Sequence, residues 1–338
     1  MKIGVRIEND WSVEQQLEYA KTAERYGFDS VWAEGNPFKR EPFSMLGVFS
    51  RETERVELGL AVASVYLMHP ILMASMAATV DELSGGRMRL AIGCSSTHAL
   101  EPLGMRQTKP LAHVREAIGA VRELLKGGAA EFDGEIFKLQ GVPLTAATGK
   151  KIPIFAAGEA PKLQTMIAEI ADGIIFPVAN AEYNRRALDN VTSGLANAGR
   201  TRDELHVVAY QRFWTVDDPA ADADVLRKLA ARLVYRVSPN ARKQMGLNEE
   251  QAAAWMDDPE TIPESLIDEL IVVGGPDRAE AGARELAALG FDELVLDFPS
   301  IKGMSHDEQF RRYYEILNNF GERVLPRLDD IRAAAVVA

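Results

Sequence analysis

Residues 58–96 read LGLAVASVYLMHPILMASMAATVDELSGGRMRLAIGCSS, and this stretch gives the clearest indication of the fold. Apolar residues first alternate with others up to Val62, and this period of two predicts a strand with one buried face. After His69-Pro70 the apolar residues recur with helical spacing until Gly85-Gly86, which predicts an amphipathic helix with a glycine C-cap. A second strand then runs into a loop of small residues. A strand, a helix and a strand in this order normally give two parallel strands, so we predict a βαβ unit.

The rest of the chain repeats this alternation of strands and helices. Further strands are predicted at residues 3–7, 28–35, 152–156, 173–176, 205–216 and 292–298. A chain of 338 residues with this rhythm fits one (β/α)8 barrel, and we expect a single domain over residues 1–338. Residues 270–275, LIVVGG, would make a ninth strand, and we interpret them as a helix-to-loop transition. At about residues 217–263 the rhythm breaks, and we predict a charged helical insertion that either covers the barrel mouth or decorates the surface.

The charge and the cysteine content exclude several classes of protein. The formal net charge is −12 and no block of Lys and Arg interrupts the acidic balance, so we expect no nucleic-acid partner and no anionic membrane surface. Cys94 is the only cysteine, which excludes an internal disulfide and a cysteine-based metal cluster. The histidines also lack the spacing of metal ligands, so we expect no metal site. The opening MKIGVRIENDW lacks the apolar core of a signal peptide and no run is long enough to span a bilayer, so we expect a cytoplasmic protein.

Four segments carry a family resemblance. They are residues 79–93 (TVDELSGGRMRLAIG), 114–139 (VREAIGAVRELLKGGAAEFDGEIFKL), 151–176 (KIPIFAAGEAPKLQTMIAEIADGIIF) and 270–296 (LIVVGGPDRAEAGARELAALGFDELVL). At these residues the chain resembles the bacterial luciferase-like superfamily of flavin and deazaflavin oxidoreductases. Within it, the chain is similar to the branch that contains methylenetetrahydromethanopterin reductase and other enzymes using the deazaflavin coenzyme F420. The resemblance implies a (β/α)8 barrel, F420 as the cofactor, a small-molecule substrate, and assembly as a homodimer or homotetramer.

The resemblance places a platform for the cofactor ring at the end of the third strand. Relatives carry a bulge there with a non-proline cis peptide bond, which presses on the back face of the ring. By position this bond is Ala61-Val62, followed by Ala63. The alternative is an ordinary strand end.

The resemblance also implies two loops that hold the cofactor phosphate. Small residues let backbone N–H groups approach an anion, and a helix N-terminus adds a favourable potential. Many relatives have more glycine in the first loop, whereas this chain has a cysteine and two serines; turn formation alone is the alternative explanation. An acidic residue in the second loop would repel a phosphate unless it points away or caps the next helix. The candidate cofactor-binding residues are Gly93, Cys94, Ser95 and Ser96 in the first loop, His98 after it, and Ala157, Gly158 and Glu159 in the second.

Glu8 and Glu34 are the candidate catalytic acids, because they follow the first and second strands on the side where a βα barrel places its chemistry. Related reductases have a carboxylate on strand one and an Asp-His pair after strand two. In this chain Arg6 stands where the relatives have the carboxylate of strand one, and Glu34-Gly35 stands where they have the Asp-His pair. A carboxylic acid in an apolar lumen has a raised pKa and is able to donate a proton. The alternative is that Arg6 and Glu8 form a structural ion pair.

These observations predict an F420-dependent oxidoreductase. It would transfer a hydride between the deazaflavin and an electrophilic C=C, C=N or iminium carbon of a small organic substrate, while the protein positions the two molecules. The likeness of residues 114–139 to the reductase branch favours this interpretation. An FMN-dependent monooxygenase on the same fold is the first alternative. A non-catalytic flavin- or F420-binding protein is the second, and the two candidate acids argue against it.

Overall fold

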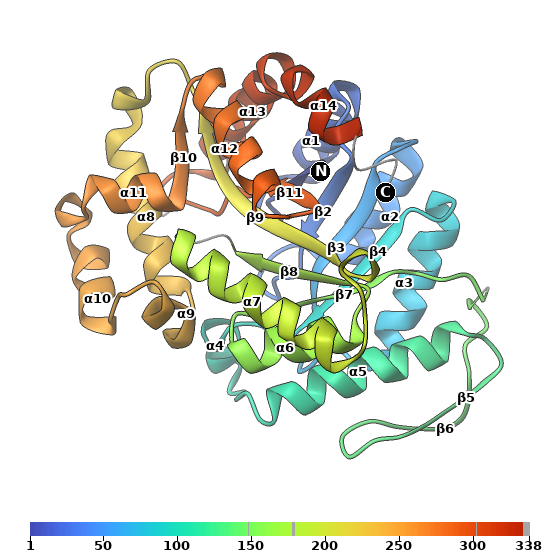
Figure 1. Cartoon of the computed structure of the whole chain (residues 1–338). Coiled ribbons are helices and arrows are strands. Elements are labelled where there is room, and N and C mark those ends of the chain that lie inside the picture. Colours follow the sequence, from blue (N-terminus) through green and yellow to red (C-terminus); the bar gives the residue numbers. More distant parts are fainter. Residues whose placement is uncertain (148, 178–179, 302, 334–338) are drawn as a thin grey trace. The chain divides into compact units, whose positions relative to one another are not determined.

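The computed structural model describes residues 1–147, 149–177, 180–301 and 303–333 (Figure 1). These residues form two compact units. Unit 2 consists of Ser30–Ile175 and Asn190–His206, and unit 1 consists of the other described residues. Each unit is built from parallel strands with helices between them, which is the alternation that the sequence predicts.

The strands of unit 2 run parallel to one another. β2 (Ser30–Glu34) pairs with β3 (Glu57–Ser64), and β3 pairs with β4 (Met88–Gly93). β4 pairs with β7 (Ile154–Ala157), which in turn pairs with β8 (Gly173–Pro177). Every residue of β4 is buried, as expected of a strand that is covered on both faces. The predicted βαβ unit over residues 58–96 is therefore confirmed.

Local sequence signals fix the helix between β3 and β4. α3 (Pro70–Ser84) begins at His69, whose Nδ1 accepts a hydrogen bond of 3.2 Å from the Ile71 N–H. It ends at Gly85, which adopts a left-handed φ of 73° that glycine tolerates at a C-cap. α3 packs against α2 (Pro42–Glu52) and α5 (Pro110–Leu125), so its apolar face is buried between its neighbours (Figure 1). The other helices of this part are α4 (Thr97–Leu100), α6 (Pro161–Ile170) and α7 (Ala181–Asn197), the last of which begins in unit 1.

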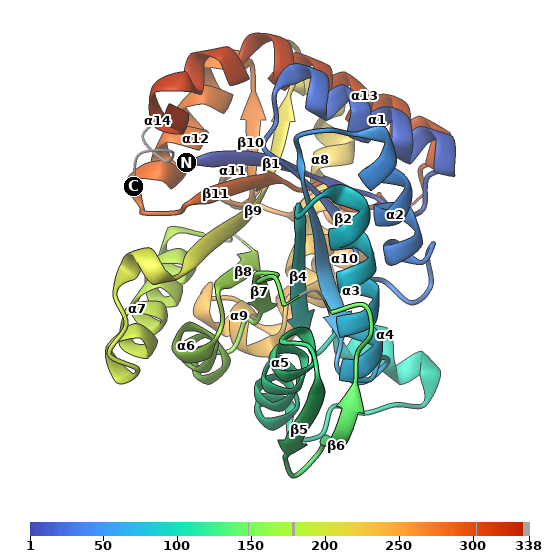
Figure 2. The same cartoon turned by 90° about the vertical axis from the view of Figure 1, so that its right-hand side faces the viewer.

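A hairpin outside the parallel sheet follows α5. Its strands are β5 (Ala129–Asp133) and β6 (Lys138–Pro143), which pair antiparallel beside α5 (Figure 2). The Glu116 carboxylate of α5 accepts from the backbone N–H groups of Ile136 at 2.8 Å and Phe137 at 3.0 Å. Asp133-Gly134 is a dipeptide typical of tight hairpin turns, and the hairpin is present. The half-buried Glu116 of the neighbouring helix fixes its turn.

Unit 1 contains a strand that the sequence analysis missed. Its parallel strands lie in the order β10, β9, β11, β1, with β1 at Lys2–Ile7, β9 at His206–Thr215, β10 at Ile271–Gly274 and β11 at Glu293–Leu296. The interpretation of residues 270–275 as a helix-to-loop transition was wrong, because β10 pairs with Arg212–Thr215 of β9. β9 is ten residues long, and it pairs with β11 at Val208–Gln211 and with β10 at Arg212–Thr215.

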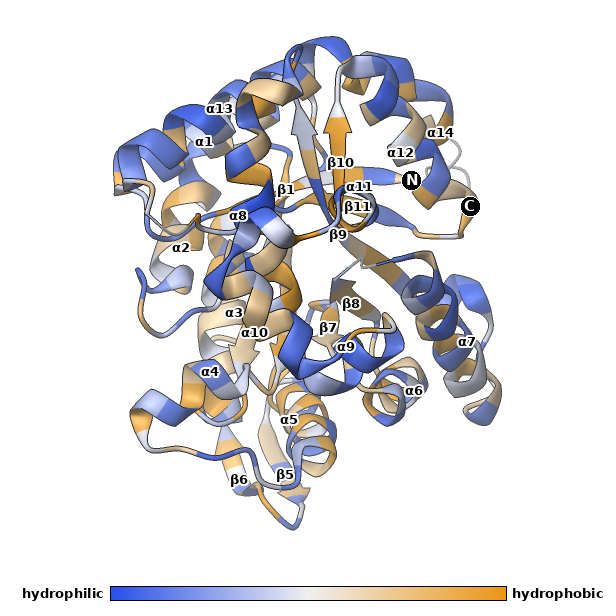
Figure 3. Ribbon diagram, turned by 90° about the vertical axis from the view of Figure 1, so that its left-hand side faces the viewer, coloured by the Kyte–Doolittle hydropathy of each residue, from blue (hydrophilic) through white to orange (hydrophobic). Residues whose placement is uncertain are grey.

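Local sequence signals also fix the ends of helices in unit 1. α1 (Val13–Tyr26) opens with a capping box of Ser12 and Gln15 and ends at Gly27, with a φ of 90°. α13 (His306–Arg323) packs against α1, and both helices carry mainly hydrophilic colour on their outer faces, whereas β10 is mainly hydrophobic (Figure 3). Unit 1 also contains α12 (Pro276–Ala288) and α14 (Asp329–Ala333).

The segment at about residues 217–263 is helical in the structure. It contains α8 (Ala223–Arg236), α9 (Pro239–Gln244) and α10 (Glu249–Asp257), and α11 (Glu264–Leu270) follows it. α8 packs against α10 and α11, which buries its apolar face. That it is an insertion in one domain over residues 1–338 stays a prediction. Within the described residues, the structure has no helix of the length and apolar character needed to cross a bilayer.

Candidate active site

The end of β3 has the bulge that the resemblance implies. The peptide bond between Ala61 and Val62 is cis. The pairing of β3 with β4 shifts at this point, since Ala61 lies opposite Ala91 and Ala63 lies opposite Ile92. The expected cis bond and bulge are therefore confirmed, whereas their role as a ring platform stays a prediction.

Two glycines from neighbouring strands lie against this bulge. A Cβ atom built on Gly35 would lie 1.9 Å from the Val62 carbonyl oxygen, and one built on Gly93 would lie 2.9 Å from Val62 Cγ2. The Gly35 N–H donates a hydrogen bond of 2.9 Å to the Ala61 carbonyl. Neither position has room for a side chain, so the ends of β2 and β4 are fixed closely against the bulge. In the sequence Gly35 is visible only as a departure from the family pattern, so this packing role was not predicted.

The two predicted phosphate loops leave neighbouring strands. Ile92 of β4 lies opposite Ala156 of β7, so Gly93 and Ala157 are the next residues of two adjacent parallel strands. The carboxyl ends of adjacent parallel strands meet at one edge of a sheet. Unit 2 therefore brings the Gly93–Ser96 and Ala157–Glu159 loops to the same edge.

The first loop is fixed by contacts to the segment that precedes α5. Ser95 adopts a left-handed φ of 57°, and its carbonyl accepts a hydrogen bond of 2.7 Å from Gln107 Nε2. The Cys94 thiol lies 3.7 Å from the Pro110 carbonyl, and burial raises the pKa of this thiol to about 11. Cys94 is therefore a neutral, packed thiol, while Ser96 and His98 are exposed.

The second loop precedes the N-terminus of α6. A Cβ atom on Gly158 would lie 2.6 Å from Leu163 Cγ, so the loop packs directly on the first turns of the helix. The N-cap of α6 is Ala160, and among the described residues no side chain caps this helix. Glu159, which is half-buried, lies one residue before the cap. Backbone N–H groups at this helix start are suited to an anion.

Glu34 ends β2 beside the bulge. Its backbone lies opposite Ala61 in the register of β2 and β3. Its Oε2 lies 2.7 Å from Lys39 Nζ, and the two side chains are 25% and 11% exposed. A neighbouring ammonium favours the ionised form of a carboxyl group. Glu34 is therefore a paired carboxylate and differs from the isolated acid in an apolar lumen that the sequence suggested.

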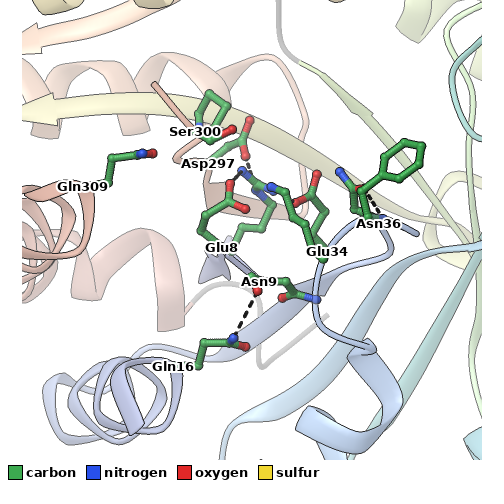
Figure 4. Close-up of polar contacts among 12 residues, drawn as sticks. Glu8, Asn9, Gln16, Glu34, Asn36, Asp297, Ser300 and Gln309 are labelled. Atoms are coloured by element: carbon green, nitrogen blue, oxygen red, sulfur yellow. Dashed lines mark hydrogen bonds and ion pairs between the residues drawn. The ribbon is translucent and has the colours of Figure 1, made fainter. Parts of the chain in front are cut away.

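Glu8 belongs to a buried cluster of charges in unit 1. Arg6 Nη2 lies 3.3 Å from Glu8 Oε2, and the same guanidinium contacts Asp297 (Figure 4). Asp297 is also paired with Arg212 at 2.9 Å. Glu8 is 1% exposed and Asp297 is 5% exposed. The alternative that Arg6 and Glu8 form an ion pair is confirmed.

Asp297 and Arg212 belong to this charge cluster of unit 1, and neither was predicted from the sequence. Asp297 directly follows β11, and its N–H donates 2.9 Å to the Gln211 carbonyl of β9. Arg212 is the next residue of β9. The available signal was the acidic residue at the end of the predicted strand 292–298, the same position relative to its strand that Glu8 has in the first.

An aromatic group lies beside this charged cluster. The Tyr313 hydroxyl donates a hydrogen bond of 2.7 Å to the Pro299 carbonyl. Burial, followed by the nearby negative charge of Glu8, raises the pKa of Tyr313 well above its ordinary value. Burial likewise raises the pKa of Tyr19 well above its ordinary value. Both phenols therefore stay protonated at neutral pH.

A comparison with known protein families shows which family this chain belongs to. A family model described as luciferase-like monooxygenase matches residues 2–293. The chain belongs to this family. The 5,10-methylenetetrahydromethanopterin reductase of Archaeoglobus fulgidus is 31% identical over 312 residues, which cover 88% of this chain and 94% of that relative. The F420-dependent glucose-6-phosphate dehydrogenase of Nakamurella multipartita is 28% identical, covering 92% of this chain and 91% of that relative.

The solved structure of coenzyme F420-dependent tetrahydromethanopterin reductase from Methanopyrus kandleri is similar throughout. The TM-score is 0.84 at 22% sequence identity, and the match covers 96% of this luciferase-like chain and 99% of that one. This similarity shows the fold, in which eight parallel strands close into a barrel with helices between them. The predicted (β/α)8 barrel and the family resemblance are therefore confirmed, and β10 is a further strand beside β9.

Proposed function

We propose that this chain is an F420-dependent oxidoreductase that transfers a hydride between the deazaflavin and an electrophilic carbon of a small organic molecule. The observation that supports it best is the cradle at the edge of unit 2. There the β3 bulge is flanked by Gly35 and Gly93, and a Cβ atom at either position would lie within 3 Å of Val62. The names of the relatives, an F420-dependent dehydrogenase among them, point to the same cofactor.

The residues of this cradle fit a flat ring carrying a phosphate. Gly35 and Gly93 place no side chain over the bulge at Val62, and a ring platform requires such a clear surface. The loops Gly93–Ser96 and Ala157–Glu159 leave the same edge of the sheet, and the uncapped start of α6 follows the second loop. Backbone N–H groups at that start would hold the phosphate.

In this proposal the protein positions the reactants and holds charge and protons. The bound deazaflavin supplies the hydride. The carboxylates of Glu8 and Glu34 are held by cations, Arg6 and Lys39 respectively, and each would orient or stabilise a positively charged or proton-donating group. Tyr313 stays protonated beside the Glu8 cluster, because burial and the charge of Glu8 raise its pKa.

An FMN-dependent monooxygenase is the second candidate function. The description of the matching family model, luciferase-like monooxygenase, favours it. The same cradle would suit an isoalloxazine ring, because the platform and the phosphate loops do not distinguish the two tricyclic rings. The two candidates therefore differ in the cofactor and share the site.

An equilibrium titration of the apoprotein with F420 and with FMN under identical conditions tests the proposal. We expect saturable F420 binding at micromolar concentration and much weaker FMN binding. Substrates of the types named for the relatives, methylenetetrahydromethanopterin and glucose 6-phosphate, together with a simple enone and an imine, would then be tested for turnover with bound F420. Tight FMN binding without F420 binding would favour the monooxygenase. Binding of F420 without turnover of any member of this panel would contradict the hydride-transfer function.

We also propose, on the family resemblance, that the chain acts in the cytoplasm as a homodimer or homotetramer. Size-exclusion chromatography with light scattering measures the mass of the particle in solution. A mass of two or four times 37.2 kDa would support the proposal, and a monomer would contradict it.

A further inference from the structure

Lys39 is unusually buried for a lysine of a surface loop. Its side chain is 11% exposed, although the Phe38 side chain before it is 57% exposed and Arg40 after it is exposed. Lysine side chains are rarely removed from water unless they are paired. The Lys39 ammonium is paired with Glu34, 2.7 Å away. The loop therefore directs one cation inward while its neighbours face outward.

A tight turn folds Lys39 back onto the end of β2. The Asn36 side-chain oxygen accepts a hydrogen bond of 3.1 Å from the Phe38 N–H, and the Asn36 carbonyl accepts one of 3.3 Å from the Lys39 N–H. Pro37, between them, fixes its own φ and stiffens the turn. The position of the Lys39 ammonium is thus set by the backbone as well as by its ion pair.

The start of this turn is anchored to the bulge of β3. Glu34 lies opposite Ala61 in the strand register, and Gly35 is pressed against the Val62 carbonyl. Lys39 is therefore hydrogen-bonded to Glu34, and the backbone of Glu34 pairs with Ala61 of the proposed ring platform. In a βα barrel this is the end of the strand where the chemistry takes place.

We propose that Lys39 is a catalytic residue and donates the proton that accompanies hydride transfer. This inference rests on the proposed function. A carboxylate paired with an ammonium has no proton to donate, whereas the ammonium has three N–H donors. Of the Glu34–Lys39 pair, Lys39 is therefore the proton donor, and Glu34 positions it.

The step balances in atoms and charge. The reduced deazaflavin, when bound, would supply the hydride: its C–H bond would break, it would be oxidised by two electrons, and a new C–H bond would form at the electrophilic carbon of a neutral C=X group. The electron pair of the C=X π bond moves to X, which takes a proton from Lys39 as one N–H bond breaks. Lys39 becomes a neutral amine and regains its proton from water, to which its side chain is 11% exposed.

A structural ion pair is the competing explanation, and substitutions at Lys39 separate the two. Lys39→Met removes the charge and the proton. Lys39→Arg keeps the charge, but a guanidinium does not give up its proton in proteins. Lys228→Met is the matched control, because Lys228 forms a comparable pair of 2.9 Å with Asp224 on the surface of α8. Each variant is assayed for F420 affinity, for thermal stability and for single-turnover oxidation of bound reduced F420 by the panel substrate that the wild type turns over.

A proton donor predicts one pattern of results. Lys39→Met and Lys39→Arg should both lose about 10²-fold or more in single-turnover rate, which is the usual contribution of general acid catalysis, with F420 affinity changed less than about threefold. Ethylamine added to Lys39→Ala should restore part of the rate in a saturable way, because a free amine supplies the missing proton. Lys228→Met should behave as the wild type.

Other results overturn the inference in distinguishable ways. Full activity of Lys39→Arg with inactive Lys39→Met would show that only the charge matters, and absence of ethylamine rescue would likewise remove the role of proton donor. Wild-type rates in Lys39→Met would remove Lys39 from the reaction while leaving the proposed function intact. Failure of the wild type to bind F420, or to oxidise it with any panel substrate, would refute the proposed function and with it the role of Lys39.

Discussion

Gly35 lies so close to Val62 that a Cβ atom at position 35 would fall 1.9 Å from the Val62 carbonyl oxygen. The neighbouring atoms are backbone, which cannot move aside as the end of a flexible side chain does. Gly35 also donates a hydrogen bond of 2.9 Å to Ala61, so β2 and β3 are joined at the point where both strands end. The relationship explains why a glycine follows Glu34 at this edge.

Gly35→Ala should disturb the proposed cofactor platform. The added methyl group must displace the Val62 backbone, so we expect at least a tenfold loss of F420 affinity and a lower melting temperature. Gly47→Ala is the matched control, because a Cβ atom there meets no atom within 4 Å and the residue lies inside α2. That control should gain about 0.5–1 kcal/mol in stability, since alanine is the better helix former. Unchanged F420 affinity in Gly35→Ala would show that the close packing of Gly35 against Val62 is not needed for cofactor binding.

Asp297→Asn should destabilise the protein strongly. Asp297 accepts contacts from Arg6 and from Arg212 at 2.9 Å, and its side chain is 6% exposed. Removing one partner of a buried charge cluster leaves the other charges uncompensated, which costs about 3–5 kcal/mol. Urea unfolding followed by circular dichroism measures the change.

The control for this variant is a pair with the same chemistry on the surface. Asp217 pairs with Arg323 at 2.9 Å, and its side chain is 72% exposed. Asp217→Asn should cost no more than about 1 kcal/mol, because water screens an exposed pair. Equal losses in the two variants would show that the Asp297 cluster behaves like an exposed one.

Asp172→Asn should destabilise the protein at neutral pH and lose this effect in acid. Burial alone would raise the pKa of Asp172, but the Ile154 N–H, Lys151 and Arg122 outweigh it and lower the pKa below its ordinary value. A carboxyl group with a lowered native pKa stabilises the fold above its unfolded pKa, and the stabilisation disappears as pH falls through the native value. At pH 7 we expect a loss of about 1.5–3 kcal/mol, as for hydrogen bonds to charged groups.

The free energy of unfolding, measured from pH 7 down to pH 3 and below, tests the sign of this dependence. The difference between wild type and Asp172→Asn should stay constant at pH values well above 3.8, the ordinary pKa of aspartate, and shrink only below it. Asp133→Asn is the control, because the Asp133 side chain is 89% exposed. A difference that grows in acid would contradict the lowered pKa.

Features that depend on neighbouring residues were predictable from the sequence. The capping box of Ser12 and Gln15 and the glycine after α3 are patterns within one helical turn, and both are present. The pair of Arg6 and Glu8 was foreseen as an alternative, because residues two apart share one face of a strand. The cis bond at Ala61-Val62 came from the family resemblance, since no local pattern encodes it.

Features that depend on distant residues were not predictable in this way. β10 was missed because a short apolar run after a helix has no distinguishing period, and its pairing with β9 is set far away in the sequence. Asp297 and Arg212 were missed for the same reason. Asp297 meets Arg6 only when β11 pairs with β1, and Arg212 meets Asp297 only when β9 pairs with β11. The Glu34–Lys39 pair is local, but it forms only when the turn after β2 folds Lys39 back, so the sequence suggested an isolated acid instead.

Cys94 should react slowly with iodoacetamide in the native protein. Burial raises the pKa of its thiol to about 11, and only the thiolate reacts. At pH 8 the thiolate population is about two orders of magnitude below that of an ordinary cysteine with a pKa near 8.5, so the rate should fall by at least that factor. Mass spectrometry gives an unambiguous reading because the chain has one cysteine.

Urea should restore the ordinary rate of Cys94 alkylation. Saturating F420 should slow the native reaction further if the Gly93–Ser96 loop holds the phosphate. Alkylation of the native protein at the rate measured in urea would show that the loop is open and that Cys94 is not packed against Pro110.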